Sequence, residues 1–463
     1  MSPIALPTLP TPPLSPPSFT SKVTGSALLH HATPQPVATS ASSLTFTLQD
    51  GTEIIDGVGG AAVACLGAGN TEIVQAMTEQ ATKLSYCYHQ LMGNEPSEQL
   101  GKFLCDRSQG AFVSAAFLNS GSEAIEAAIK LCRQYWVEKG QPQRKYIIAR
   151  FPSYHGNTLG ALAVGNIPAR RDMYTPLLST TAFHHVPSPT YLRSHLPDES
   201  ETSYSARLAS ELDAKIRELG PENIMAFFAE PVVGAALGVM PPPSGYFPAI
   251  SKVVRGHDIL LVMDEVMSGM GRCGSLFAHQ AVAEGIKPDI CAIAKGLGAG
   301  YVTISGILVG DKVQRVVKQA GQWKSSHTYQ NHPINCAVAL KVCQIVERDQ
   351  LLQNVRQRGD QMRAELRDGL KGVQRVFDIR GKGLFTGIEL DAPSSLSPRF
   401  AARVKEKCFQ NGLLILGLSG TIDGKEGEAL VIAPAYIISA EQVSQMVSVL
   451  VKSIKASVSE LEA

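Results

Sequence analysis

The sequence predicts an α/β protein: a mostly parallel, mixed sheet flanked by helices, with a smaller α+β domain beside it. Between residues 112 and 310, short apolar runs alternate with segments of helical periodicity, as in parallel sheets covered by helices on both faces. After residue 333, two long helical patterns precede further short apolar runs. A chain of 463 residues is long enough for two or more subdomains.

The N-terminal segment divides into a tail and a hairpin. Residues 1–43 are rich in proline and lack arginine and a signal-type apolar core, which predicts a disordered tail. The next residues alternate apolar and polar side chains around Asp50-Gly51, a turn dipeptide that predicts a hairpin. Helical periodicity follows at 70–84 and 96–107. We expect residues 44–95 to join the smaller domain.

Six apolar runs mark the strands of the expected large domain, residues 96–332. Ligands of parallel sheets lie beyond the carboxyl ends of the strands, so the residues that follow each run are the candidates for function. The runs are Ala115–Leu118, Tyr146–Phe151, Met225–Ala229, Ile259–Met263, Ile290–Ala294 and Ile304–Val309.

The expected small domain is completed by residues 333–463. Its pattern predicts two helices, three strands and a closing amphipathic helix. In order, these are Pro333–Arg348, Leu351–Lys371, strands around 383–390, 412–417 and 429–436, and Ser439–Ser453.

Composition excludes several classes of function. The net charge of +1 leaves no electrostatic footprint for nucleic acid or an acidic membrane. No apolar run approaches the roughly 20 residues needed to span a bilayer. The nine cysteines are scattered, odd in number and without a CxxC pair, which favours a reducing compartment. We therefore expect a cytoplasmic protein that binds neither nucleic acid nor membrane.

The first strand end is a candidate anion site. Ser120 and Glu123 have the spacing of a capping box that opens a helix. Gly121 allows close approach of a ligand, and Ser122 adds a hydroxyl where free N–H groups and the helix dipole favour a negative charge. A plain capped helix is the alternative.

Three further strand ends carry an aromatic side chain and acids. Tyr154 and His155 follow the second strand on a glycine turn, where the aromatic ring could stack on a planar ligand or pack against the loop. Glu230 follows the third strand, and Asp264 ends the fourth, where a buried acid needs a partner. No His, Asp and Glu cluster with metal-ligand spacing lies nearby, so no metal is expected.

Lys295 follows the fifth strand, in the stretch ICAIAKGLGAG. A lysine that reaches water at a strand end is the simple interpretation. Together, however, the strand ends offer an anion site, an aromatic plate, a buried carboxylate and an amine. These are the groups that pyridoxal 5′-phosphate (PLP) requires for its phosphate, ring, ring nitrogen and aldehyde.

The chain also resembles the class III (ω-amino-acid type) PLP-dependent aminotransferases of fold type I. The resemblance extends from about Asp50 to Val443 and rests on the order of several motifs. They are DGTEIIDGVGGAAVACLGAGN, NSGSEAIEAAIK, SYHGNTLGAL, AEPVVG, LLVMDEVMSGMGRCG, DICAIAKGLGAGY, HTYQNHP and IRGKGLFTGIEL.

The resemblance implies roles for individual residues. Lys295 corresponds to the lysine that forms the Schiff base, Asp264 to the partner of the pyridine nitrogen, and Glu230 to an acid close to the cofactor. Thr328 corresponds to a residue that reaches the phosphate in the neighbouring subunit, which implies a homodimer with shared active sites. The remaining cofactor-binding positions are Ser120, Gly121 and Ser122 at the phosphate, and Tyr154, His155 and Val266 around the ring. Tyr86, Tyr88 and His89 lie where relatives line the substrate pocket, although an ordinary packed helix end is the alternative.

Three positions depart from the common family pattern. Ala235 and Val431 stand where members that handle α-amino acids have a glutamate and an arginine that grips the α-carboxylate. Thr303 stands in place of a usual proline. The segment containing Val431 resembles a branch with amine or ω-amino substrates and some relatives that are not transaminases.

The expected activity is transfer of an amino group from an amine or amino-acid donor to an oxo acceptor by a ping-pong Schiff-base mechanism. The alternative is a PLP-dependent decarboxylase, racemase or lyase on the same scaffold, which the absence of the usual glutamate and arginine pair favours. A nicotinamide-dependent oxidoreductase would need GxGxxG after an N-terminal strand, whereas GLGAG lies late and has the wrong spacing. A catalytically silent binding protein would have no chemical need for both Lys295 and Asp264.

Overall fold

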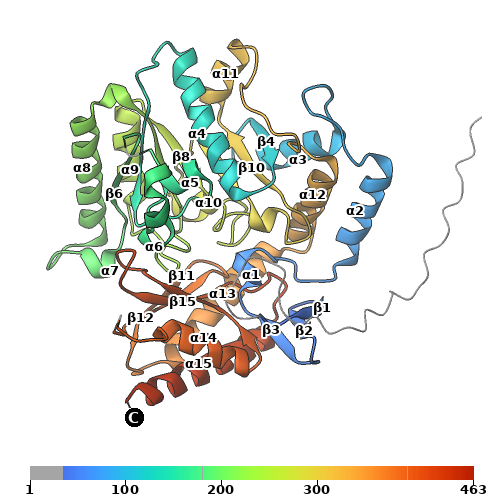
Figure 1. Ribbon diagram of the computed structural model, residues 1–463, viewed down its shortest axis with the longest axis vertical. Helices are drawn as coiled ribbons and strands as arrows, with labels where there is room; N and C mark the ends of the chain where they lie inside the picture. Colours follow the sequence, from blue (N-terminus) through green and yellow to red (C-terminus); the bar gives the residue numbers. More distant parts are fainter. Residues whose placement is uncertain (1–34, 180, 394, 463) are drawn as a thin grey trace, which may run out of the picture.

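The computed structural model describes residues 35–179, 181–393 and 395–462 and contains three β-sheets (Figure 1). The central seven-stranded sheet has the order β4-β10-β9-β8-β7-β5-β6. Only β10 runs antiparallel to its neighbours; the other pairs are parallel. Its strands are β4 (Ser114–Leu118), β5 (Tyr146–Phe151), β6 (Phe183–Pro187), β7 (Ile224–Ala229), β8 (Leu260–Asp264), β9 (Ile290–Ile293) and β10 (Ser305–Val309).

Helices cover both faces of this sheet, as the long apolar runs require. Alternate residues of each strand pack on opposite faces: Leu260 and Val262 of β8 face α4, whereas Leu261 and Met263 face α8 and α9. Figure 1 shows α4 on one side of β8 and the pair α8 and α9 on the other. The helices of this part are α4 (Gly121–Glu138), α5 (Leu159–Val164), α6 (Pro168–Arg171), α7 (Tyr191–Ser194), α8 (Glu201–Leu219), α9 (Tyr246–Gly256), α10 (Ala278–Val282) and α11 (Asp311–Gln319).

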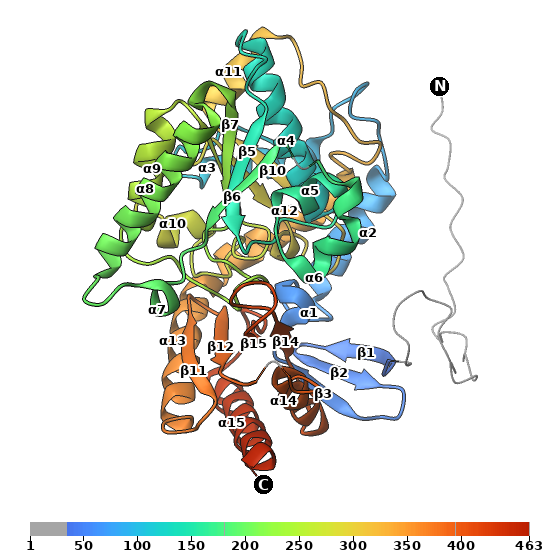
Figure 2. The ribbon, with the colours of Figure 1, turned by 60° about the vertical axis from the view of Figure 1, so that its left-hand side comes forward.

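The N- and C-terminal segments meet in a second layer of structure below the central sheet (Figure 2). One small sheet has the order β1-β2-β3-β13, so that β13 near the end of the chain pairs with the N-terminal hairpin. The other has the order β11-β12-β15-β14. These strands are β1 (Ala38–Ser42), β2 (Thr45–Leu48), β3 (Glu53–Asp56), β11 (Val376–Gly381), β12 (Thr386–Leu390), β13 (Leu413–Leu414), β14 (Leu416–Ser419) and β15 (Glu428–Ile432).

Helices on the small sheets complete the fold. Helix α12 contributes to two cores: Val338 and Val342 pack with the small sheets, and Cys336 and Ala339 pack with residues of the central sheet. The remaining helices are α1 (Gly59–Ala62), α2 (Thr71–Lys83), α3 (Glu95–Asp106), α12 (Pro333–Arg348), α13 (Leu351–Gly369), α14 (Phe400–Gln410) and α15 (Ala440–Glu462). No helix in the described ranges has both the length and the apolar character needed to cross a bilayer.

The structure corrects two expectations at the chain ends. Strand β1 lies inside the segment 1–43 that the sequence predicts to be disordered, because its residues pair with β2. Residues 1–34 of the expected tail lie outside the described residues. The closing helix predicted at Ser439–Ser453 extends to Glu462, since small and apolar residues continue the periodicity.

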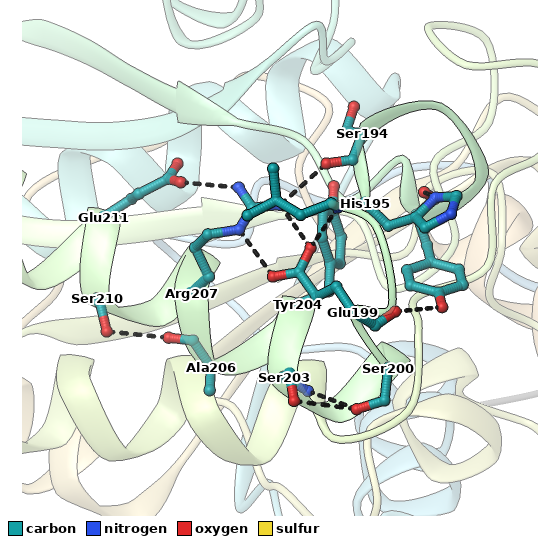
Figure 3. Close-up of polar contacts among 12 residues, drawn as sticks. Ser194, His195, Glu199, Ser200, Ser203, Tyr204, Ala206, Arg207, Ser210 and Glu211 are labelled. Atoms are coloured by element: carbon teal, nitrogen blue, oxygen red, sulfur yellow. Dashed lines mark hydrogen bonds and ion pairs between the residues drawn. The ribbon is translucent and has the colours of Figure 1, made fainter.

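Ion pairs and hydrogen bonds join the two layers. Arg193 on α7 bonds Glu389 of β12 at 2.7 Å, and Glu389 also pairs with Arg380 of β11. The segment between α7 and α8 is itself anchored by Arg207, which donates to both carboxylate oxygens of Glu199 at 2.8 and 2.9 Å and to the carbonyl oxygen of Ser194 (Figure 3). Arg380 in turn donates to two carbonyl oxygens of the loop that follows β7, and that loop begins at Glu230.

Candidate active site

The carboxyl ends of β4, β7, β8 and β9 bring the candidate residues to one edge of the central sheet. Strands β7, β8 and β9 are adjacent and parallel, so that Glu230, Asp264 and Lys295 lie at the carboxyl ends of neighbouring strands. The segment after β5 carries Tyr154 and His155 to the same edge. The sequence predicted this convergence because the carboxyl ends of parallel strands lie at one edge of a sheet.

Asp264 is a buried carboxylate with two partners. Its Oδ2 lies 2.7 Å from Nδ1 of His155, and its Oδ1 accepts a hydrogen bond from the Val266 N–H at 2.9 Å. Both side chains are almost completely buried. His155 Nε2 has no hydrogen-bond partner among the described residues. The histidine therefore fixes the orientation of the carboxylate and supports its negative charge.

Glu230 is held by backbone groups of two loops. Its carboxylate accepts hydrogen bonds from the Tyr154 N–H at 3.2 Å and the Gly234 N–H at 2.9 Å. Burial raises the pKa of Glu230; the charges of His155 and Asp264 act in opposite directions, and the Gly234 hydrogen bond lowers it. Glu230 thus joins the segment after β5 to the segment after β7.

Lys295 opens a short 3₁₀ turn, Lys295–Leu297, which is separated from β9 by Ala294 alone. Its backbone has φ 48°, a left-handed conformation that is uncommon for residues other than glycine and is concentrated at functional sites. Burial lowers the pKa of its amine from 10.5 to about 8, against the opposing charges of Asp264 and Glu230 and with the help of Arg170 and Arg272. An amine with this pKa can gain and lose a proton near neutral pH.

The N-terminus of α4 forms the anion end of the site. The Ser120 hydroxyl accepts a hydrogen bond from the Glu123 N–H at 3.2 Å, as predicted. The Glu123 carboxylate, however, accepts from the Asn119 N–H at 2.8 Å and not from Ser120, so the predicted capping box is shifted by one residue. No described residue accepts from the Gly121 and Ser122 amides, which leaves them available to an anion.

Two glycines allow three segments to converge there. A Cβ at Gly121 would lie 2.7 Å from Val266 Cγ1, and one at Gly156 would lie 2.7 Å from Ser122 Oγ. Gly156 also has φ +135°, a conformation that other residues avoid. The Ser122 hydroxyl accepts a hydrogen bond from the Asn157 N–H at 2.9 Å. Gly156 is the glycine of the turn predicted after the second strand, but its close approach to Ser122 was not predicted.

The chemical groups that these residues offer match the groups of PLP. Free amides at a helix N-terminus suit a phosphate, and a buried, oriented carboxylate suits a protonated ring nitrogen. The Tyr154 ring and Val266 provide flat and apolar contacts, and Lys295 provides an amine of lowered pKa. No hydrogen bond within the described part of the chain engages the Lys295 amine.

The expected pocket residues form a separate group with Thr328. The Tyr86 hydroxyl donates to the Thr328 carbonyl oxygen at 2.8 Å, and its ring lies 5.7 Å from that of Tyr329. Tyr88 donates to Gln90, and the His89 ring lies 5.5 Å from the Tyr88 ring. Within the described residues, no hydrogen bond or ring contact joins this group to Lys295 or Asp264.

The fold also brings together Glu265, His279 and Cys291, whose ligand atoms lie within 4.8 Å of one another. Sequence spacing did not reveal this group because the three residues come from different elements. Both Glu265 oxygens already accept hydrogen bonds, from the Ala278 and His279 N–H groups and from the His279 ring. The carboxylate therefore anchors the start of α10 to the end of β8.

Comparisons with known proteins agree with this geometry. A family model described as Aminotransferase class-III matches residues 30–454. An uncharacterized aminotransferase of Schizosaccharomyces pombe is 40% identical over 433 residues, covering 92% of this chain and 94% of that protein. The putrescine–pyruvate aminotransferase of Pseudomonas aeruginosa is 30% identical, with 89% of each chain covered.

A solved structure matches over almost the whole chain. The ω-transaminase of Pseudomonas jessenii, determined in complex with PMP, superposes with a TM-score of 0.87 at 28% identity. The match covers 94% of this chain and 97% of that one. The expected fold type I architecture is thereby confirmed.

Proposed function

Since the chain belongs to the class III aminotransferase family and is a PLP-dependent transaminase, we propose that Lys295 is its catalytic lysine and Asp264 the partner of the cofactor ring. The observation that carries this proposal is the largely buried amine of Lys295, with a pKa of about 8, at the strand end next to that of Asp264. When bound, PLP supplies an aldehyde that condenses with amines and a ring that accepts an electron pair.

The protein groups act around that chemistry. Lys295 Nζ, whose pKa lies close to neutral pH, would take the proton from the amine-bearing carbon of the substrate and deliver it to the carbon of the cofactor's aldehyde group. Asp264, oriented by His155, holds a proton on the ring nitrogen. The α4 amides and the Ser122 hydroxyl would hold the phosphate, and the Tyr154 ring would pack against the cofactor ring.

The proposed donors are amines or ω-amino acids, and the acceptor is an oxo acid. Support comes from relatives named for such substrates: the putrescine–pyruvate aminotransferase and, at 32% identity, a chloroplastic gamma-aminobutyrate transaminase of Solanum lycopersicum. Incubation of the loaded enzyme with a panel of amines and either pyruvate or 2-oxoglutarate tests this. We expect alanine or glutamate to form in proportion to the donor consumed. Donor consumption that needs no acceptor would point instead to decarboxylation or another lyase reaction.

We further propose a homodimer in which Thr328 contributes to the neighbouring active site. Thr328 is exposed in the single chain and lies on a segment with other exposed groups, such as Tyr329. Heterodimers of Lys295→Ala and Thr328→Ala subunits provide the test, because shared sites would leave one complete site per heterodimer. We expect that site to bind the cofactor with wild-type affinity. If every heterodimer site retains the weak affinity of the Thr328→Ala homodimer, the sites are not shared.

A reducing compartment such as the cytoplasm is the proposed location. Its support is that all nine cysteines are unpaired thiols, eight of them buried. Cell fractionation with an antibody to the protein would test it, and recovery from an oxidising compartment would contradict it.

A further inference from the structure

Arg170 is an exposed cation beside the candidate active site. It lies on the short helix α6, and its guanidinium carbon is 4.6 Å from the centre of the Tyr154 ring. Burial is the main cause of the lowered pKa of the Lys295 amine, and the positive charge of Arg170 lowers this pKa further. The Arg170 backbone N–H donates to the Ile167 carbonyl oxygen at 2.9 Å, but no carboxylate or carbonyl of the described residues accepts a hydrogen bond from its guanidinium. The guanidinium is therefore available to a ligand.

The backbone beneath Arg170 is held from two sides. Ile167, at the start of α6, packs against Val233, Ala236 and Leu237 in the loop that follows Glu230. On the other side, a Cβ at Gly424 would lie 2.2 Å from Pro168 Cδ, so the loop between β14 and β15 touches α6 directly. Helix α6 lies where the two layers of the molecule meet (Figure 2). Because both loops pack against α6, its backbone is held in place, and Arg170 stays close to the site.

The nearby acids do not neutralise this cation. Asp264 is engaged by His155 and Val266, and Glu230 by the Tyr154 and Gly234 amides. A guanidinium offers five N–H donors in a planar fork that matches the two oxygens of a carboxylate. The position of Val431 offers no such cation, because this side chain is buried among apolar residues that include Phe385 and Leu418.

We propose that Arg170 binds the carboxylate of the substrates, and that the enzyme acts on amino acids and oxo acids in preference to amines without an acid group. This inference rests on the proposed transaminase function and assigns its substrate class. Arg170 is a specificity-determining residue in this account: it acts on the far end of the substrate and moves no proton. The cation–π contact with the Tyr154 ring holds the guanidinium near the site.

Pairs of donors that differ only in a carboxylate distinguish carboxylate binding by Arg170 from a general effect on activity. The pairs are 3-aminopropanoate with propylamine, 4-aminobutanoate with butylamine, and 5-aminopentanoate with pentylamine. We expect the wild type to prefer the acid of every pair that it accepts. Arg170→Gln should raise KM for the acids about ten- to hundredfold, the range expected for a charge-assisted bidentate contact, and should leave KM for the amines within about twofold.

Two variants control for charge and folding. Arg171→Gln removes the adjacent, half-buried arginine, whose charge is felt at His185, and should leave the preference for acids unchanged. Arg170→Lys keeps the charge but loses the fork and should fall between the wild type and Arg170→Gln. Because Arg170 is exposed, Arg170→Gln and Arg170→Lys should unfold at the same urea concentration as the wild type.

Binding of butanoate, which has no amine to react, gives a readout without turnover. Calorimetry of the loaded enzyme should show that Arg170→Gln weakens butanoate binding about ten- to hundredfold, while the affinity for PLP itself is unchanged. Equal losses for acids and amines, or a loss of PLP affinity, would overturn the assignment and indicate a general or cofactor-binding role. If the wild type transfers amino groups from neither member of any pair, the proposed function fails instead.

Discussion

Replacing Lys295 by methionine should stabilise the cofactor-free protein at neutral pH. Burial lowers the pKa of the lysine from 10.5 to about 8 in the folded state, whereas the unfolded chain restores the ordinary value. A difference of one pKa unit corresponds to about 1.4 kcal/mol, so the protonated amine costs the folded state about 3 kcal/mol. Methionine has similar length and no charge, and it removes this cost.

The gain should depend on pH in a defined direction. Below pH 8 the lysine is protonated in both states, and the wild type bears the full cost. Between pH 8 and 10.5 the unfolded chain binds a proton that the folded protein does not, so wild-type stability rises with pH relative to the variant. Above pH 10.5 both states are neutral and the difference disappears.

Urea unfolding of the cofactor-free proteins at fixed concentration measures the difference. We expect Lys295→Met to be about 3 kcal/mol more stable at pH 7 and nearly equal to the wild type at pH 10.5. Lys130→Met, which changes an exposed lysine on α4, is the control and should differ from the wild type by less than about 0.5 kcal/mol at every pH. No gain at pH 7, or a gain that is the same at both pH values, would refute the account of Lys295.

Three further changes probe the site and its supports. Asp264→Asn should lower kcat about 10²- to 10³-fold in steady-state assays, because the ring loses a preorganised charge; a change of less than twofold would exclude the assigned role. Gly156→Ala should weaken PLP binding and destabilise the protein by about 1–3 kcal/mol, because its Cβ meets Ser122, whereas Gly256→Ala, where a Cβ meets nothing within 4 Å, should have little effect on either quantity. Glu265→Gln should reduce stability by about 1–3 kcal/mol in urea without changing KM, because the carboxylate holds the start of α10; a change in KM alone would be inconsistent with this.

The central sheet was predictable because its strands are continuous apolar runs bounded by turn residues. Strand β5 begins and ends as predicted, and helix α12 spans the predicted Pro333–Arg348 since proline favours its first turn. Strand β6 was missed because FHHVP is a half-buried edge strand with two histidines and a terminal proline. Strand β1 was missed because it adjoins the proline-rich segment and owes its structure to pairing with β2.

The candidate site was predictable in so far as parallel strands end at one edge. That rule placed Glu230, Asp264 and Lys295 at one edge of the sheet. The structure shows that their strands are adjacent and that hydrogen bonds join the acids to the segment after β5. The bond from His155 to Asp264 was not predicted, because it depends on the path of a loop. Arg170 gave no signal in the sequence: only the packing of α6 between two distant loops brings it to Tyr154.

The most direct test of the account is to locate the covalent bond between cofactor and protein. The loaded enzyme is treated with borohydride, which makes such a bond permanent, then digested and analysed by mass spectrometry. We predict that the pyridoxyl phosphate mass is found on the peptide containing Lys295 and is absent from Lys295→Met. A label on a different lysine, or bound cofactor with no labelled lysine, would contradict the central claim.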